Sequence, residues 1–332
     1  MKVAVFGASG HTGRFVVREL LERGLDPLPS GRDEAGLRAA HPELEVRRAS
    51  VDDPESLDRA LFGAQAVINC AGPFATTAAP MIEAALRTGI SYVDVSAEIE
   101  LVQDTFARFT DRAHHARISV IPAMAFFGGL GDLLTTTALG KRTAADEVHV
   151  AYGLSGWHPT PGTRVAGRVS RGRREGRRVR HEDGHLEYRD DAPPILEWPF
   201  PQPLGPRRVI GEFSMVDVVT IPSHVDVPRV TTYMTLEAAE EVADPHLPTA
   251  TDDRRAESFL VDVLVRSKDE EEHVFVTGRD IYAVTAPLAV EAALRILSGR
   301  ARVTGVASAG EAFDAPDFLR ALSAHLTFGR TS

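Results

Sequence analysis

VAVFGASGHTG, residues 3–13, is the stretch that decides the fold of the first part of this chain. A short apolar run followed by three glycines at intervals of three predicts a strand, a tight turn and the start of a helix. Gly7 can adopt the positive φ of such a turn, Gly10 lets a diphosphate lie against the backbone, and Gly13 lets the helix lie close to the strand. The helix N-terminus adds free N–H groups and a partial positive charge. The stretch therefore predicts a dinucleotide site, and a glycine-rich turn without a ligand is the alternative.

The composition limits what kind of protein this is. The chain has 332 residues, of which 43% are hydrophobic, enough for one or two globular domains with apolar cores. A net charge of −10 disfavours general binding to nucleic acid. Cys70 is the single cysteine, which excludes a disulfide within the chain and suits a reducing compartment. Because neither a signal peptide nor a membrane span is recognisable, we expect a cytoplasmic protein, and the loosely spaced histidines predict no metal site.

Apolar strands and helices alternate through the first 125 residues. After the first strand, we expect strands at residues 25–30, 44–50, 66–70, 90–95 and 118–122. The helices between them include residues 80–88, closed by Gly89, and residues 98–117. This alternation predicts an α/β fold with a Rossmann-type, doubly wound parallel sheet and right-handed crossovers. It forms a dinucleotide-binding domain over residues 1–125.

The pattern changes near residue 145. Strand candidates there are residues 147–154, 163–171, 177–181, 186–189, 214–221, 229–236, 258–266 and 273–279, and the last two could pair. They predict a second α+β domain at residues 126–279, built on a mainly antiparallel sheet, for substrate binding or dimerisation. The segment 280–332 is expected to be helical and to pack back on the first domain.

In an open parallel sheet, ligands collect beyond the carboxyl ends of the strands. Ser30 and Arg32 lie at the end of the second expected strand. The planar guanidinium of Arg32 suits the 2′-phosphate of NADP, so the sequence favours NADP over NAD. The alternative is a solvated arginine with Asp33 as the ribose ligand.

Further loops at the same edge add candidates. Asp52 or Asp53 could accept a hydrogen bond from the adenine amino group, although Asp53 is equally suited to cap the next helix. Asn69 and the small residues after it, up to a proline-fixed bend at Pro73, could line a ribose or the nicotinamide. An ordinary strand-to-helix turn is the alternative.

Asp94 and Glu98 are the candidates for catalysis. A carboxylate beside a nicotinamide could take part in proton transfer or hold a substrate ammonium. The alternative for Glu98 is that it merely starts the next helix, where a negative charge is favourable. Tyr92 and Asp94 share one side of their strand, so a buried polar side chain there needs a partner.

Four segments together resemble the saccharopine dehydrogenase-like family of NAD(P)-dependent oxidoreductases, including its trans-acting enoyl reductase-like members. They are residues 7–13, VINCAGPF at 67–74, GISYVDVSAE at 89–98, where Ala97 replaces a usual glycine, and residues 282–305. The resemblance implies cofactor-binding roles for Gly7, Ser9, Gly10, Thr12, Gly13, Arg32, Ala71, Gly72 and Pro73. His11, Ser30, Asp52 and Asn69 complete the predicted set.

One block departs from this family. Many members have G-F-D-x-x-P-x-D-L after the sixth strand, whereas this chain has FFGGLGDL at residues 126–133 and clearly retains only Asp132-Leu133. That block lies where the substrate would meet the nicotinamide, so the substrate cannot be carried over from the amino-acid enzymes. Asp132 could cap the following helix or reach the site.

The resulting hypothesis is an NADP-dependent reductase that transfers a hydride to a C=N or activated C=C bond of a small or carrier-bound substrate. A non-catalytic NADP(H)-binding sensor or scaffold is the alternative. The arginines of residues 171–180, expected on a hairpin, could guide an anionic or carrier-bound substrate, or form a solvated tip. The antiparallel sheet could also leave an edge for a homodimer.

Overall fold

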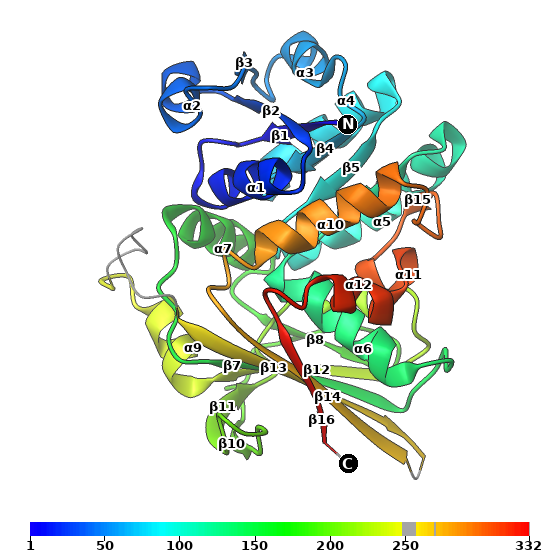
Figure 1. Ribbon diagram of the computed structural model, residues 1–332. Coiled ribbons are helices and arrows are strands. Elements are labelled where there is room, and N and C mark those ends of the chain that lie inside the picture. The colour runs from blue at the N-terminus through cyan, green and yellow to red at the C-terminus, as the bar shows by residue number, and fades with distance from the viewer. Residues whose placement is uncertain (248–256, 269, 332) are drawn as a thin grey trace.

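The computed structural model describes residues 1–247, 257–268 and 270–331, and its described strands form two sheets that lie one above the other in Figure 1. The first sheet has seven parallel strands in the order β15-β6-β5-β4-β1-β2-β3. These are β1 (Lys2–Phe6), β2 (Asp26–Gly31), β3 (Arg47–Arg48), β4 (Ala66–Asn69), β5 (Ser91–Asp94), β6 (Ser119–Ile121) and β15 (Gly305–Val306). The predicted Rossmann-type sheet is confirmed, although the strand expected at 44–50 is reduced to β3.

Helices cover both faces of this sheet because its strands bury alternate residues on opposite sides. Val3 and Val5 share one apolar cluster with α1 (His11–Glu22) and α10 (Thr285–Leu297). Ala4 and Phe6 share another with α3 (Pro54–Leu61) and α4 (Phe74–Thr88). α5 (Ile99–Ala116) packs against α4 and β15, and α2 (Glu34–Ala40) packs against β2.

The second sheet, among the described residues, has nine strands. Seven follow the order β10-β11-β12-β7-β13-β14-β16, and β8 pairs with β12 and β9. They are β7 (Glu147–Leu154), β8 (Arg178–Glu182), β9 (His185–Arg189), β10 (Ile195–Trp198), β11 (Arg207–Gly211), β12 (Arg229–Thr235), β13 (Ser258–Ser267), β14 (Glu270–Arg279) and β16 (Thr327–Thr331). The β13–β14 pairing is as expected. β12 and β7 pair in parallel, so the sheet is mixed, with mainly antiparallel pairs.

Two predicted strands of the second domain are helical. Residues 163–171 belong to α7 (Pro161–Arg173), and residues 214–221 contain α8 (Asp217–Thr220). The β-branched residues of the first segment favour a strand locally. However, the Thr160 side chain accepts a hydrogen bond from the Thr163 N–H, and Pro161 follows at the first helical position. Capping and docking against the first domain outweigh that local preference.

The remaining described elements are short helices and one irregular helical turn. η1 (Phe126–Leu130) is an irregular turn of helix that leads into α6 (Gly131–Leu139), and α9 (Leu236–Ala243) follows β12. α11 (Ala309–Ala312) and α12 (Ala315–Ala321) pack against α6. The described part of segment 280–332 is therefore not all helical: β15 extends the first sheet, whereas β16 pairs with β14 in the second. No helix in the described ranges is long and apolar enough to cross a bilayer.

Candidate cofactor site

The glycine loop between β1 and α1 has little room for side chains. Gly7 has φ +82°, and a Cβ there would lie 2.8 Å from the Ala71 backbone nitrogen. A Cβ on Gly13 would lie 2.3 Å from the Gly7 carbonyl oxygen. Gly10, by contrast, is exposed, and its Cβ would meet only that same oxygen, at 3.2 Å. Gly7 and Gly13 therefore bring strand, loop and helix together, and Gly10 leaves the helix N-terminus open to a diphosphate, so the residues fit the predicted group.

β2 holds this loop from the side. The Gly7 and Ala8 N–H groups donate to the Ser30 carbonyl oxygen at 2.8 and 3.2 Å, and the buried Ser30 hydroxyl donates to the Val5 carbonyl. Ser30 therefore shapes the loop rather than presenting its hydroxyl to a ligand. Ser9, His11 and Thr12 are half-buried on the loop and at the start of α1.

Arg32 and Asp33 follow the carboxyl end of β2. Asp33 caps α2, since its carboxylate accepts the Gly36 N–H at 3.0 Å. Arg32 is exposed, and its side chain has no hydrogen bond or ion pair within the described residues. Of the two, Arg32 is thus the side chain that is available to a ligand at this edge.

The candidates beside the adenine position differ in the same way. Asp53 caps α3 through the Ser56 N–H at 3.1 Å, as the sequence allowed. Asp52 is exposed, and among the described residues its carboxylate is engaged only by a 3.4 Å contact with the Ser50 hydroxyl. Asp52 is therefore the freer of the two.

Asn69 is fully buried beneath the loop that follows β4. Its amide donates to the Tyr92 hydroxyl at 3.1 Å and to Thr77, and its oxygen accepts the Ala71 N–H at 3.0 Å. Tyr92 in turn donates to Asp94 at 3.0 Å, which is the partner that the shared strand face required. Asn69 thus fixes the backbone at Ala71 from below, and half-buried Ala71, exposed Gly72 and half-buried Pro73 form the surface of the loop.

The two carboxylates predicted for catalysis hold the backbone. Asp94 is fully buried and accepts the N–H groups of Ser96 and Ala123, both at 2.9 Å, which joins the ends of β5 and β6. Glu98 accepts the N–H groups of Phe74 and Ala75 at 2.7 and 2.9 Å. Burial raises the pKa of Asp94 and of Glu98, and these backbone hydrogen bonds act against that rise. Each carboxylate therefore has a clear structural role.

The contact made by Glu98 also explains why α4 begins at Phe74 rather than at residue 80 as expected.

Glu98→Ala should lower the free energy of unfolding by about 2–3 kcal/mol, because the buried Phe74 N–H loses its acceptor. Urea unfolding would measure this. Asp53→Ala, which removes an exposed cap, is the control and should cost about 1 kcal/mol. A loss no larger than that of the control would contradict the role of Glu98.

Sequence reasoning missed Tyr282 as part of this site, although it begins one of the resembling segments. Its ring lies edge-on to His11 of the glycine loop, with centroids 5.3 Å apart. Its hydroxyl accepts the Thr160 N–H at 3.1 Å and shares a hydrogen bond with Thr163 at 3.1 Å. Trp157 donates to it at 3.3 Å. Tyr282 therefore ties the start of α7 to the glycine loop.

The arginine-rich segment is not a hairpin tip. Residues 171–180 end α7 and begin β8, and most of their guanidinium groups pair with carboxylates of this chain. The pairs are Arg173–Asp104, Arg174–Glu100, Arg177–Glu175, Arg178 with Asp191 and Glu212, and Arg180 with Glu182, Glu187 and Glu212. Internal neutralisation of this kind leaves little charge for an anionic partner.

Asp132 lies in the first turn of α6 and is fully buried. It does not cap that helix. Its carboxylate accepts the Gly310 N–H at 2.7 Å and pairs with His224 Nε2 at 2.7 Å, which joins α6 to α11. The interaction with Asp132 raises the pKa of His224, against the opposing effect of burial.

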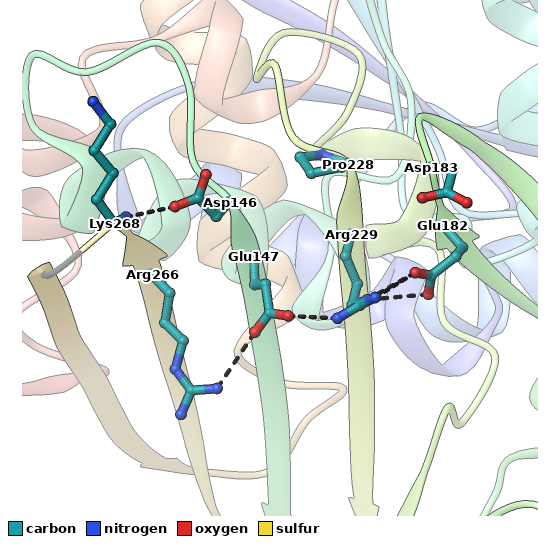
Figure 2. Close-up of a pocket in the computed structure, with 8 residues that line it drawn as sticks. All are labelled: Asp146, Glu147, Glu182, Asp183, Pro228, Arg229, Arg266 and Lys268. Atoms are coloured by element: carbon teal, nitrogen blue, oxygen red, sulfur yellow. Dashed lines mark hydrogen bonds and ion pairs between the residues drawn. The ribbon is translucent and has the colours of Figure 1, made fainter.

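A charged groove of about 410 Å³ lies on the second sheet (Figure 2). It is lined by Asp146, Glu147, Glu182, Asp183, Pro228, Arg229, Arg266 and Lys268. Glu147 lies between Arg229 and Arg266, at 2.5 and 3.4 Å, and Arg229 also pairs with Glu182. The groove is at the start of β7. The other end of this strand, Leu154, is about 23 Å away along the strand. The acidic and basic side chains of the groove neutralise one another in these ion pairs. The groove is not part of the glycine-loop site.

Comparisons with known proteins find relatives of the N-terminal part of the chain. Residues 7–119 match the NAD(P)H-binding family. A probable mitochondrial saccharopine dehydrogenase-like oxidoreductase of Arabidopsis thaliana is 32% identical over 142 residues, 37% of this chain and 31% of the relative. The saccharopine dehydrogenase-like oxidoreductase of Homo sapiens is 28% identical over 145 residues, 37% of this chain and 34% of the relative. These matches span about a third of each relative.

The fold has a counterpart that extends over both sheets. Apo saccharopine dehydrogenase (L-Glu forming) from Saccharomyces cerevisiae superposes with a TM-score of 0.70 and 12% identity, and the match covers 100% of both chains. At this identity the likeness concerns the fold alone. Residues 7–119 match an NAD(P)H-binding family, the N-terminal part of the chain is similar to saccharopine dehydrogenase-like oxidoreductases, and the chain shares the fold of saccharopine dehydrogenase.

Proposed function

We propose that this protein is an NADP-dependent oxidoreductase that reduces a C=N or activated C=C bond of a small or carrier-bound substrate. The observation that carries the proposal is the glycine loop, in which Gly7 and Gly13 have no room for a Cβ while Gly10 leaves the helix N-terminus open. The bound reduced cofactor would supply the hydride, which adds to carbon, and one proton completes the reduction. The chain binds and orients the cofactor and keeps water away from the reacting atoms.

Arg32 supports NADP as the cofactor. It is exposed at the carboxyl end of β2, and no described residue neutralises it, whereas Asp33 is occupied as the cap of α2. A guanidinium in this position can hold the 2′-phosphate through two parallel hydrogen bonds.

Arg32→Ala should weaken NADPH binding by about 1.5–3 kcal/mol and leave NADH binding nearly unchanged, because only NADPH carries the 2′-phosphate. Calorimetric titration with both cofactors would measure this. Arg38→Ala is the matched control: it removes an exposed arginine of α2 that already pairs with Glu34. Equal losses for NADPH and NADH would show that Arg32 is not the phosphate ligand.

One observation favours a non-catalytic NADP(H)-binding sensor as a second candidate. Asp94 and Glu98 remain the predicted catalytic residues, yet the carboxylates of both are occupied by backbone N–H groups. Stopped-flow oxidation of bound NADPH by imines and by enoyl thioesters separates the two candidates. Tight NADPH binding without oxidation by either class would favour the sensor.

The carrier-bound substrate has less support than the small one. Its docking would use the arginines of residues 171–180, most of which pair within the chain. Charge reversal at Arg173 and Arg174 that left activity on a carrier-bound substrate unchanged would count against it. We also propose, from composition and sheet edges, a cytoplasmic location and a homodimer.

A further inference from the structure

We propose that Glu100 is a positioning residue that latches α7 across the carboxyl ends of β4 and β5, and so sets the space in which the substrate meets the nicotinamide. This inference rests on the proposed function. It concerns α7, which the sequence pattern alone did not predict. The α7 latch denotes Glu100 together with Ser170 and Arg174.

The position of α7 follows from what its two ends contact. Near its start, Thr160 and Thr163 bond to the Tyr282 hydroxyl, and the Tyr282 ring lies against His11 at the beginning of α1. Near its end, Ser170 contacts Glu100 in the first turn of α5. α1 follows β1 and α5 follows β5, and β4 lies between these two strands in the sheet.

A 13-residue helix is about 20 Å long, and two strand spacings amount to about 10 Å, so α7 can bridge all three carboxyl ends. It also packs against α4 and α5, and Figure 1 places it below α1, between the two sheets. Ligands of open parallel sheets bind at this edge. α7 is therefore the element of the second domain that covers the predicted nicotinamide position.

The α7 latch is a compact buried cluster. The Glu100 carboxylate accepts the Ser170 hydroxyl at 2.6 Å and pairs with the Arg174 guanidinium at 3.2 Å. Arg174 also donates to the Ser170 hydroxyl at 2.8 Å. The side chains of Arg174 and Glu100 are only 13% and 8% exposed.

Glu100 is the main compensation for the charge of Arg174. The Nε of Arg174 is buried and has no hydrogen-bond partner within the described ranges. Removing the Glu100 carboxylate would leave a buried guanidinium without its counter-charge, which is strongly unfavourable. The end of α7 should then move away from α5 so that Arg174 reaches water.

A second ion pair joins the same two helices and provides an internal control. Arg173 pairs with Asp104 at 2.6 Å, one turn further along α5, but its side chains are 36% and 46% exposed. Exposed pairs contribute little because solvent screens them. If burial is what makes the α7 latch hold, only the inner pair should affect α7.

Glu100 also completes a pattern in the segment that runs from the end of β5 to the first turn of α5. Asp94 joins this segment to Ala123 beyond β6, Glu98 joins it to the start of α4, and Glu100 joins it to α7. Three carboxylates of this segment thus hold three neighbouring elements. Glu100 is the one among them that reaches the second domain.

The test compares Glu100→Gln and Ser170→Ala with Asp104→Asn in the full chain. Amide hydrogen exchange of residues 164–174 in the cofactor-free protein should accelerate about tenfold or more in Glu100→Gln, by a smaller factor in Ser170→Ala, which loses only hydroxyl hydrogen bonds, and less than about twofold in Asp104→Asn. The NADPH dissociation constant should stay within about twofold, whereas kcat/KM for the imine or enoyl thioester that oxidises bound NADPH should fall about tenfold. Ser170→Ala keeps the inner ion pair and so guards against a misfolded Glu100 variant.

The outcomes separate the α7 latch from a general effect on stability. Unchanged exchange in α7 would overturn the inference. A parallel fall of thermal stability, NADPH affinity and kcat/KM would overturn it as well, because a merely structural role predicts that result. If the wild-type protein bound no NADPH, the proposed function would fail and the positioning role with it. In that case the amide hydrogen exchange rates of α7 would still decide whether the contact between Glu100 and Ser170 holds the helix in place.

Discussion

Gly13→Ala is expected to destabilise the N-terminal domain and to abolish NADPH binding together. The new Cβ would lie 2.3 Å from the Gly7 carbonyl oxygen and 2.8 Å from Ala8 Cα, and both of these are backbone atoms. A backbone clash of this kind forces α1 away from β1 and should cost about 3 kcal/mol or more. Thermal unfolding followed by calorimetry, with and without NADPH, would measure both effects.

Gly10→Ala is the matched variant of the same loop. Gly10 has φ −71° and ψ 168°, which alanine adopts readily, and its Cβ would lie 3.2 Å from the nearest atom, the Gly7 oxygen. The cofactor-free protein should therefore keep its stability within about 1 kcal/mol, while NADPH binding weakens about 100-fold because the methyl group occupies the diphosphate position. Tight NADPH binding by Gly10→Ala would refute the proposed position of the diphosphate.

Asp217→Asn is expected to change how stability depends on pH. Asp217 is fully buried, its Oδ1 accepts the Tyr152 hydroxyl at 2.8 Å, and its Oδ2 has no partner in the described part of the chain. Burial raises the pKa of Asp217 from 3.8 to about 7. Between these two pH values the unfolded chain ionises here and the folded chain does not.

The sign follows from proton binding. The folded state holds the Asp217 proton more tightly, so stability from this group is fully present below pH 3.8 and is lost as pH rises toward about 7. The whole loss is about 4 kcal/mol, and above pH 7 it stays constant. Asp217→Asn lacks this loss of stability. The free energy of unfolding of the variant should therefore rise relative to that of the wild type between pH 4 and pH 7.

Urea unfolding at intervals of pH would test this expectation. Tyr152→Phe is the companion variant, because the Tyr152 hydrogen bond lowers the pKa of Asp217 and its removal should shift the loss to higher pH. Parallel stability curves for the wild type and Asp217→Asn would show that Asp217 does not titrate in this range.

The local chemistry of the first domain could be read from single segments. The glycine spacing predicted the loop, Asp53 was recognisable as a cap, and the shared strand face of Tyr92 and Asp94 required a hydrogen-bond partner of the kind that forms. Each of these depends on residues within a few positions of one another. Short-range rules of turn, cap and strand periodicity are sufficient for them.

The carboxylates at the end of β5 and after it show what local sequence patterns cannot predict. Asp94 and Glu98 were predicted as catalytic groups from their position, but they also hold the backbone N–H groups of Ala123, Phe74 and Ala75, which lie 23 to 29 positions away in the chain. Glu100 and Ser170 are 70 positions apart. No local pattern predicts a partner at such a separation in the chain, because side-chain pairing between distant segments is set by how helices and strands dock.

The sequence by itself determined the parallel sheet, the glycine loop and the cationic residue at the end of β2, since backbone sterics and hydrophobic period act between near neighbours. Only the tertiary structure decided that residues 161–173 form a helix across the strand ends, and that the arginines after it are already paired. The reason is that burial against a distant element can outweigh the weak local preference of a polar, glycine-containing segment.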